Sequence, residues 1–180
     1  MTFFISGGAK NGKSALAQNL AVGLANGGKR YYIATMIPTD SEDYDRIKRH
    51  IADRDGLDFK TVECFKNIND CLAVCDKNAT FLLDSVTAML QNAMFDASNN
   101  YEPDLSAAKR CGDEMVSFAR TVKNVIFVSD CIYSDCERYS KTTEQYREAL
   151  ADIDKKLAAV CDSVIEVSGG IYTVHKGELI

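Results

Sequence analysis

A glycine-rich stretch near the start of the chain constrains the fold more than any other feature. Residues 7–14 match the pattern G-x-x-x-x-G-K-[ST] of a phosphate-binding P-loop. The apolar run at residues 2–5 is typical of a β-strand, and residues 14–24 have helical spacing with leucines on one face. Glycines let the backbone wrap a phosphate, and the helix N-terminus directs positive partial charge at the anion. This context favours a phosphate site over a chance glycine turn.

The P-loop supplies two side chains with defined roles. Lys13 is expected to reach the β- and γ-phosphates of a nucleoside triphosphate, and the Ser14 hydroxyl is expected to ligate Mg²⁺. Such a loop also needs a Walker B carboxylate to hold the metal. Asp84 follows the apolar run at residues 80–83, as expected for a carboxylate at the end of a buried parallel strand. The alternative is an ordinary aspartate that caps the next helix.

Strand-like and helix-like segments alternate along the rest of the chain. We expect strands at residues 2–5, 30–35, 59–64, 80–84, 124–129, 163–167 and 171–174, and helices at 14–24, 39–54, 68–74, 86–97, 105–120 and 143–161. The helix at 39–54 begins with a Thr39-x-x-Glu42 capping box. The alternation predicts an α/β fold of the P-loop NTPase type, with a mostly parallel central sheet, helices on both faces and a C-terminal β-hairpin. We expect one domain spanning residues 1–180.

Charge and hydropathy exclude several classes of partner. The chain has a net charge of −5, so it lacks the basic footprint of a protein that binds nucleic acid. It has no apolar run of the roughly 20 residues that a membrane span needs. The N-terminal residues do not resemble a signal peptide, so we expect a cytoplasmic protein.

The cysteines favour reduced thiols over a metal site. Seven cysteines is an odd number, and none of them forms a C-x-x-C pair. Only two histidines, His50 and His175, are available to complete a zinc site. Most of the cysteines are therefore expected to act as small residues of the core.

His50 is the third candidate for chemistry. Arg46, His50 and Arg54 are spaced four apart on the predicted helix and project from one face. Neighbouring cations disfavour the imidazolium form, and a nucleophilic histidine must be neutral. The two arginines are also suited to clamp a phosphate. The spacing by itself favours the alternative, a solvated basic face with a bystander histidine.

Several motifs in order along the chain carry a family resemblance. They are the P-loop at residues 7–14, Tyr32-Ile33-Ala34-Thr35, the R-I-x-x-H element that ends at His50, Glu63, residues 82–87 with Asn92, Tyr146-Arg147 and Leu157-Ala158. With these motifs the chain resembles the bifunctional adenosylcobinamide kinase / adenosylcobinamide-phosphate guanylyltransferase family of cobalamin biosynthesis. It differs from the family pattern at residues 129–133 and at Asp154 and Lys155.

The resemblance implies two activities and a set of site residues. A nucleoside triphosphate, ATP or GTP with Mg²⁺, phosphorylates adenosylcobinamide. GTP then donates GMP to that corrinoid phosphate through a guanylylated histidine, which is His50 in this chain. The resemblance further implies a homotrimer in which the histidine helix faces a neighbouring subunit. The residues implied in nucleotide binding are Gly7, Gly8, Ala9, Lys10, Asn11, Gly12, Lys13, Ser14, Ala34, Thr35, Met36, Ile51, Ala52, Asp53, Arg54, Glu63 and Asp84. The implied metal ligands are Ser14 and Asp84, and the implied catalytic residues are His50 and Lys13.

Two other functions are compatible with the same residues. One is a diverged P-loop kinase or NTPase of the same fold that acts on another small metabolite and forms no guanylyl adduct. The other is a nucleotide-binding regulatory protein with little turnover.

Overall fold

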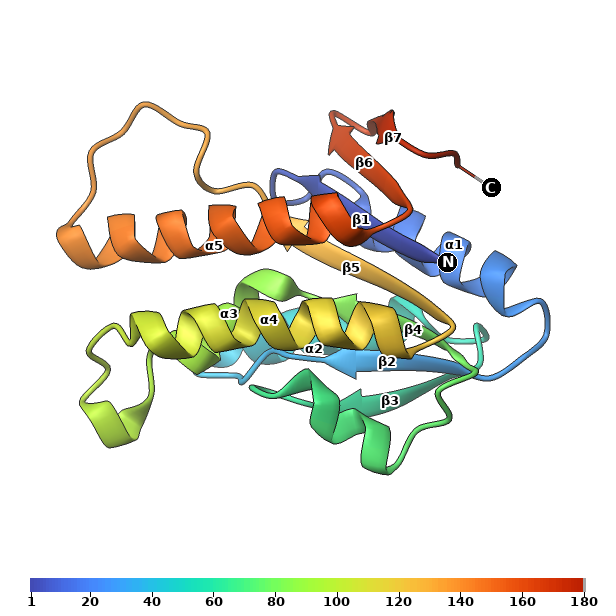
Figure 1. Ribbon diagram of the computed structural model, residues 1–180. Helices are drawn as coiled ribbons and strands as arrows, with labels where there is room; N and C mark the ends of the chain where they lie inside the picture. Colours follow the sequence, from blue (N-terminus) through green and yellow to red (C-terminus); the bar gives the residue numbers. More distant parts are fainter. Residues whose placement is uncertain (180) are drawn as a thin grey trace.

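The computed structural model describes residues 1–179 and contains a seven-stranded sheet (Figure 1). The strand order across the sheet is β3-β2-β4-β5-β1-β6-β7. All neighbouring strands are parallel except β7, which runs antiparallel to β6. The strands are β1 (Thr2–Gly7), β2 (Arg30–Ala34), β3 (Phe59–Glu63), β4 (Thr80–Asp84), β5 (Asn124–Asp130), β6 (Ser163–Ser168) and β7 (Ile171–Lys176). The predicted α/β class with a mostly parallel sheet is confirmed.

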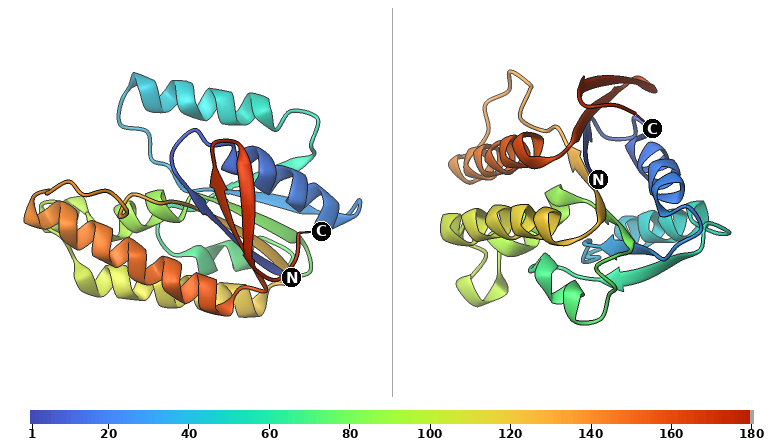
Figure 2. Two further views of the ribbon diagram at one scale, coloured as in Figure 1. Left: turned by 90° about the horizontal axis from the view of Figure 1, so that it is seen from above. Right: turned by 45° about the vertical axis from the view of Figure 1, so that its right-hand side comes forward.

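Helices cover both faces of the sheet, as predicted. The helices are α1 (Lys13–Ala25), α2 (Ser41–Asp53), α3 (Val86–Met94), α4 (Leu105–Thr121) and α5 (Lys141–Val160), with short 3₁₀ turns η1 (Ile68–Ala73) and η2 (Ala97–Asn99). Helices α3, α4 and α5 pack on one face, while α1 packs on the other (Figure 2). Helix α2 lies on the α1 side but stands away from the sheet, and none of its residues is buried.

The central strands β1, β4 and β5 are mostly apolar, as expected for strands whose two faces are both buried. In β4, Phe81 and Leu83 contribute to the core under α3, α4 and α5, whereas Leu82 contributes to the core under α1. Alternate residues of a strand point to opposite faces, so one continuous apolar run supplies both cores. None of the helices in residues 1–179 combines the length and the apolar character that a bilayer span requires.

The predicted start of the second helix is wrong by two residues. The helix begins at Ser41 with Asp40 as its N-cap, not at Thr39. The Asp40 carboxylate accepts a hydrogen bond of 2.9 Å from the backbone N–H of Asp43, and aspartate is a stronger N-cap than threonine. The Thr39 hydroxyl instead donates to the Asp43 carboxylate at 2.8 Å. The capping-box prediction is therefore replaced by a pairing between Asp40 and Asp43.

Two further boundaries differ from the predictions. The helix expected at residues 86–97 ends at Met94, and η2 follows after a break. The last helix begins at Lys141 because the Ser140 hydroxyl caps it by accepting from the Thr143 N–H at 3.2 Å. The C-terminal hairpin is confirmed, and its turn requires the positive φ angles of Gly169 and Gly170, 57° and 79°.

The cysteines are unpaired in the part of the chain that the structure describes. Cys64, Cys71, Cys111 and Cys161 are buried, which agrees with a packing role. Cys136 is exposed, while Cys75 and Cys131 are partly buried.

Candidate active site

The P-loop lies between the end of β1 and the start of α1. Gly12 is the N-cap of α1 and has a φ of 90°, which a residue with a Cβ rarely adopts. Gly7 ends β1 so close to β6 that an added Cβ would overlap the carbonyl group of Val167. These two glycines allow the loop to turn directly from the strand into the helix.

The Lys13 side chain is held inside the loop by two partners. Its side chain is only 6% exposed, and its Nζ donates to the Gly8 carbonyl oxygen at 2.6 Å. The same ammonium group pairs with the Asp130 carboxylate at 2.8 Å. Asp130 ends β5, the strand next to β1, and its backbone is in register with Gly7. Asp130 is not among the site residues that the sequence motifs predict.

Ser14 and Asp84 lie together, as expected for a Mg²⁺ site. The Ser14 hydroxyl donates to Oδ2 of Asp84 at 2.9 Å, although the two residues lie on different elements. Asp84 ends β4, which is separated from β1 by β5 in the sheet. A serine hydroxyl and a carboxylate are oxygen ligands of the kind that Mg²⁺ prefers, so these residues fit the metal. The neighbouring Ser85, not Asp84, caps α3.

His50 lies close to the same carboxylate. Its Nδ1 is 3.9 Å from Oδ2 of Asp84, and its side chain is 25% exposed. Asp84 therefore touches the P-loop serine on one side and faces the histidine of α2 on the other. Asp84 thus links His50 to the P-loop within a single chain.

A cavity of about 260 Å³ separates α2 from the ends of β2, β3 and β4. Of the predicted nucleotide-binding residues, Ala34, Thr35, Met36, Ile51, Arg54, Glu63 and Asp84 line it, together with His50 and Arg46. Ala52 and Asp53 are exposed and do not line this cavity. The P-loop residues 7–14 do not line it either and connect to it through Asp84.

Two polar atoms on the cavity wall have no hydrogen-bond partner among the described residues. They are Nδ1 of His50 and Nη1 of Arg54, and both atoms are buried. Arg54 is only 8% exposed, and its guanidinium group stacks over the Tyr32 ring at 3.4 Å. Buried polar groups normally find a partner, so unpaired polar atoms at a cavity wall are suited to a polar ligand. His50 and Arg54 thus turn inward, and the solvated-face alternative does not hold for them.

Hydrogen bonds between neighbouring residues hold the part of the cavity wall around Thr35 in place. The Thr35 hydroxyl donates to the Ser85 carbonyl at 2.9 Å and accepts from the Ser85 N–H at 2.8 Å. Asn92 donates from Nδ2 to the carbonyls of Thr35 at 2.7 Å and Phe65 at 2.9 Å. Burial, with a smaller contribution from Asp84, raises the pKa of Tyr32, so its phenol stays protonated.

A second cavity of about 600 Å³ adjoins the first. The two cavities share Met36, Arg46, Ser85 and Ala88 as lining residues. The second one extends from Asp130 and Thr87 toward η2 and the loop before α2. The sequence contains a signal for Asp130, because Asp130 ends a buried strand just as Asp84 does. Carboxyl ends of parallel strands are where α/β proteins bind ligands.

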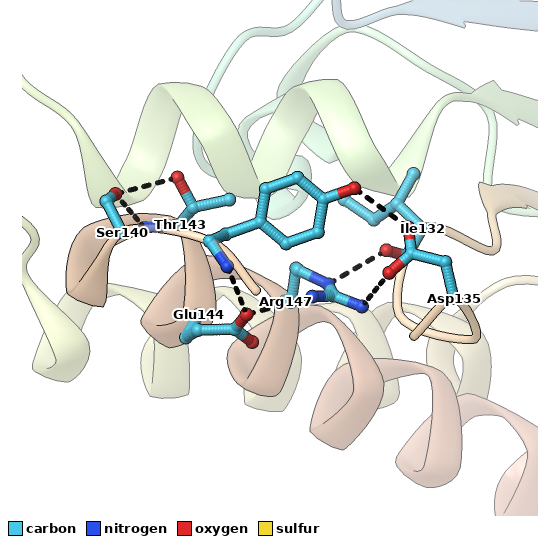
Figure 3. A network of polar contacts seen from close by, with 7 residues as sticks. Ile132, Asp135, Ser140, Thr143, Glu144 and Arg147 are labelled. Carbon is cyan, nitrogen blue, oxygen red and sulfur yellow. Dashed lines mark hydrogen bonds and ion pairs between the residues drawn. The ribbon is translucent and has the colours of Figure 1, made fainter. Parts of the chain in front are cut away.

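Arg147 holds the segment that follows Asp130 (Figure 3). Its guanidinium group donates to the Ile132 carbonyl at 3.0 Å, to Glu144 at 3.0 Å and to Asp135 at 2.7 Å. It also lies 4.6 Å from the centre of the Tyr139 ring. Arg147 is 7% exposed, and each nitrogen of its buried guanidinium group has a hydrogen-bond partner. The arginine thus connects α5 to residues 131–140.

The sheet order, the loop and the Ser14–Asp84 contact define an α/β protein with a P-loop between its first strand and its first helix. Residues 3–174 match the model of the cobinamide kinase / cobinamide phosphate guanyltransferase family. The chain therefore belongs to this family of bifunctional enzymes.

The comparisons with known proteins gave the following matches. The bifunctional adenosylcobalamin biosynthesis protein CobU of Escherichia coli K12 is 27% identical over 180 residues, which cover 95% of this chain and 97% of that protein. Among solved structures, the flagellar accessory protein FlaH of Methanocaldococcus jannaschii aligns with a TM-score of 0.45 at 14% identity. That alignment covers 98% of this chain and 78% of FlaH.

Proposed function

We propose that this chain phosphorylates adenosylcobinamide with a nucleoside triphosphate and then transfers GMP from GTP to the corrinoid phosphate through His50. One observation carries the proposal. The Asp84 carboxylate accepts a hydrogen bond from the P-loop Ser14 and lies 3.9 Å from Nδ1 of His50. A triphosphate held by the loop therefore has a histidine within reach of its phosphates.

The proposed nucleotide site extends across the P-loop and the cavity under α2. Residues 7–14 hold the phosphates with backbone N–H groups and with Lys13. The cavity, lined by Ala34, Thr35, Met36, Ile51 and Glu63 among others, receives the nucleoside. Arg46 and Arg54 flank His50 and neutralise phosphate charge. Ala52 and Asp53, exposed beside them, are left as contacts implied by the resemblance alone.

Ser14 and Asp84 are the residues that would hold Mg²⁺. When bound, the metal neutralises charge that develops on the phosphate oxygens. Lys13 supplies a second positive charge, and its buried position excludes water from around the ammonium group.

In the transferase reaction, His50 acts as the nucleophile. An imidazole nitrogen attacks the α-phosphorus of GTP, the bond from that phosphorus to the bridging oxygen breaks, and pyrophosphate leaves with the electron pair. A phosphoramidate on His50 results. An oxygen of the corrinoid phosphate then attacks the same phosphorus, and the P–N bond breaks to regenerate the imidazole. Two easier displacements replace one difficult one.

Product analysis with matched variants tests the proposal. The protein is incubated with adenosylcobinamide, ATP and GTP, and the corrinoid products are separated and weighed by mass spectrometry. The unaltered chain is expected to give adenosylcobinamide-GDP. His50→Ala is expected to stop at the corrinoid phosphate, and Lys13→Ala is expected to give neither product.

His175→Ala is the control, because His175 is exposed on β7 and pairs with Glu166, away from both cavities. It should match the unaltered chain. If the unaltered chain phosphorylates the corrinoid but never transfers GMP, the transferase half of the proposal fails. If it hydrolyses the nucleotide but forms neither corrinoid product, the diverged-kinase alternative replaces the proposal.

The resemblance also predicts a homotrimer. Light scattering coupled to size-exclusion chromatography tests the assembly, and a monomer mass for the active protein would refute it.

A further inference from the structure

Asp130 lies between the P-loop lysine and the second cavity. Its carboxylate pairs with Nζ of Lys13 at 2.8 Å, and its side chain is 19% exposed. Its backbone N–H donates to the Thr87 hydroxyl at 2.9 Å, which fixes the end of β5 against α3. Both Asp130 and Thr87 line the second cavity. One carboxylate therefore contacts the phosphate-binding machinery and an adjacent space at the same time.

The other carboxylates that line this cavity have different tasks. Asp40 caps α2, and Asp43 accepts from the Thr39 hydroxyl and N–H. Asp96 pairs with Lys66 and accepts from the Ser98 N–H. Among the lining carboxylates of the described chain, Asp130 is the one that touches the P-loop.

The position of Lys13 locates Asp130 relative to a bound triphosphate. The P-loop lysine contacts the β- and γ-phosphates, so a carboxylate paired with its ammonium group lies about one hydrogen bond from the γ-phosphoryl group. A hydroxyl that enters from the second cavity reaches that phosphoryl group past Asp130. A volume of about 600 Å³ is in the range of small-molecule sites, and it fits a hydroxyl-bearing arm with one edge of a larger ring system.

We propose that Asp130 is the catalytic base of the phosphorylation step and that the second cavity binds the hydroxyl-bearing arm of the acceptor. The inference rests on the kinase half of the proposed function. The acceptor hydroxyl gives its proton to a carboxylate oxygen of Asp130 as its oxygen attacks the γ-phosphorus. The bond from the γ-phosphorus to its bridging oxygen breaks, and the nucleoside diphosphate leaves with the electron pair.

The two cavities share part of their lining, which explains how one acceptor molecule can be phosphorylated and then receive GMP. Met36, Arg46, Ser85 and Ala88 border both cavities, so the new phosphate forms beside the cavity that contains His50. The acceptor arm then needs only a short displacement to meet the guanylylated histidine.

Asp130→Asn tests the base against a purely structural role. The variant keeps the size of the side chain and removes its ability to accept a proton. We expect kcat for corrinoid phosphorylation to fall by about 10²–10⁴-fold, which is the usual size of general-base catalysis. The KM for the nucleotide should change less than about threefold, and guanylylation of His50 by GTP should persist. Asp130→Glu should recover part of the lost kcat.

Asp113→Asn is the matched control, because Asp113 also pairs with a lysine but is exposed on α4. It should leave all rates unchanged. Phosphorylation by Asp130→Asn at the rate of the unaltered chain would overturn the proposal. A joint loss of nucleotide binding and guanylylation would also overturn it, since Asp130 would then act by holding Lys13. If the unaltered chain forms no corrinoid phosphate, the proposed function fails and the role of Asp130 fails with it.

A substitution in η2 tests the cavity itself. Ala97 is exposed and lines the second cavity, whereas its neighbour Ser98 does not line it. Ala97→Trp should raise the KM for the corrinoid at least about tenfold and leave His50 guanylylation intact. Ser98→Trp should leave the KM unchanged. Equal KM values for Ala97→Trp and the unaltered chain would overturn the acceptor assignment.

Discussion

At the residue scale, burial and hydrogen bonding shift the pKa of the Asp154 carboxyl group on α5 in opposite directions. Its side chain is 3% exposed, and Oδ2 accepts from the Ser129 hydroxyl at 3.0 Å and the Tyr133 hydroxyl at 2.9 Å. Its Oδ1 is buried without a partner. Burial raises the pKa of Asp154 to about 6, even though the two hydroxyl hydrogen bonds lower it. Ionising this residue therefore costs folding free energy.

The stability of the protein should depend on pH through Asp154. Between pH about 4 and 6 the folded state binds this proton more tightly than the unfolded state, so the free energy of unfolding falls as pH rises through that window. Asp154→Asn cannot ionise. We expect it to be more stable than the unaltered chain at pH 8 by about 1–3 kcal/mol, because each pKa unit is worth about 1.4 kcal/mol. The difference should shrink toward pH 4.

Urea unfolding at pH 4, 6 and 8 measures this dependence. Asp152→Asn is the control on the same helix, since that side chain is 72% exposed, and its effect should be within about 0.5 kcal/mol. A difference for Asp154→Asn that is the same at every pH would contradict the account.

At the element scale, the segment at residues 131–140 has no helix or strand and is held by hydrogen bonds to side chains of α5, among them Arg147 and Asp154. Arg147 reaches from α5 to Ile132, Asp135 and Tyr139, as Figure 3 shows for its polar partners. On the same helix, the Tyr146 hydroxyl donates to the Thr87 carbonyl at 2.9 Å. Helix α5 thus fixes both the segment after Asp130 and the start of α3.

Removing the arginine should loosen this segment before it unfolds the domain. We expect Arg147→Met to lower the free energy of unfolding by about 1–3 kcal/mol, because hydrogen bonds to charged groups are lost. Amide hydrogen exchange within residues 131–140 should become faster, while exchange in β1 and β4 changes little. Arg110→Met removes an exposed pair with Asp104 and should have almost no effect. Unchanged exchange at 131–140 in Arg147→Met would refute the anchoring role.

Local sequence patterns were sufficient to predict some of the strands and helices but not all of their ends. The buried strands β1, β4 and β5 could be predicted because each is a short apolar run that needs no knowledge of its neighbours. The start of α2 could not be placed as well, because Thr39 and Asp40 are both acceptable N-caps. The choice depends on which side chain reaches the N–H of Asp43.

The positions of the candidate site residues also differ in how well local patterns predict them. The closeness of Ser14 to Asp84 could be predicted, because a motif places one and the end of a buried strand places the other. The pairing of Lys13 with Asp130 could not, since it joins residues far apart in the sequence across the β1–β5 register. Local spacing also misread α2, where His50 and Arg54 face a cavity that only the folded chain creates.

At the scale of the whole molecule, α2 is the α-helix that is least attached to the rest of the fold: it stands away from the sheet (Figure 2) and, alone among the five α-helices described, buries none of its own residues. Arg54, just beyond its end, anchors it by stacking on the Tyr32 ring. A nucleotide that bridges the P-loop and the cavity under α2 would join the helix to the rest of the fold. Ligand binding should therefore stabilise the whole protein.

Thermal unfolding measures this coupling. GTP with Mg²⁺ at 100 times its Kd should stabilise the folded state by about 2.7 kcal/mol. For a chain of this size that corresponds to a rise in Tm of roughly 5–10 °C. Lys13→Ala should lose most of the shift, and Lys48→Ala, which changes an exposed lysine of α2, should keep it. An equal shift in Lys13→Ala would show that the nucleotide binds elsewhere.

The central claim is that His50 carries the guanylyl group, and mass spectrometry of the protein after incubation with GTP and Mg²⁺ tests it most directly. The account predicts one added guanylyl group, located by peptide mapping on His50, absent from His50→Ala and retained by His175→Ala. An adduct that persists in His50→Ala, or the absence of any adduct on a protein that makes adenosylcobinamide-GDP, would contradict it.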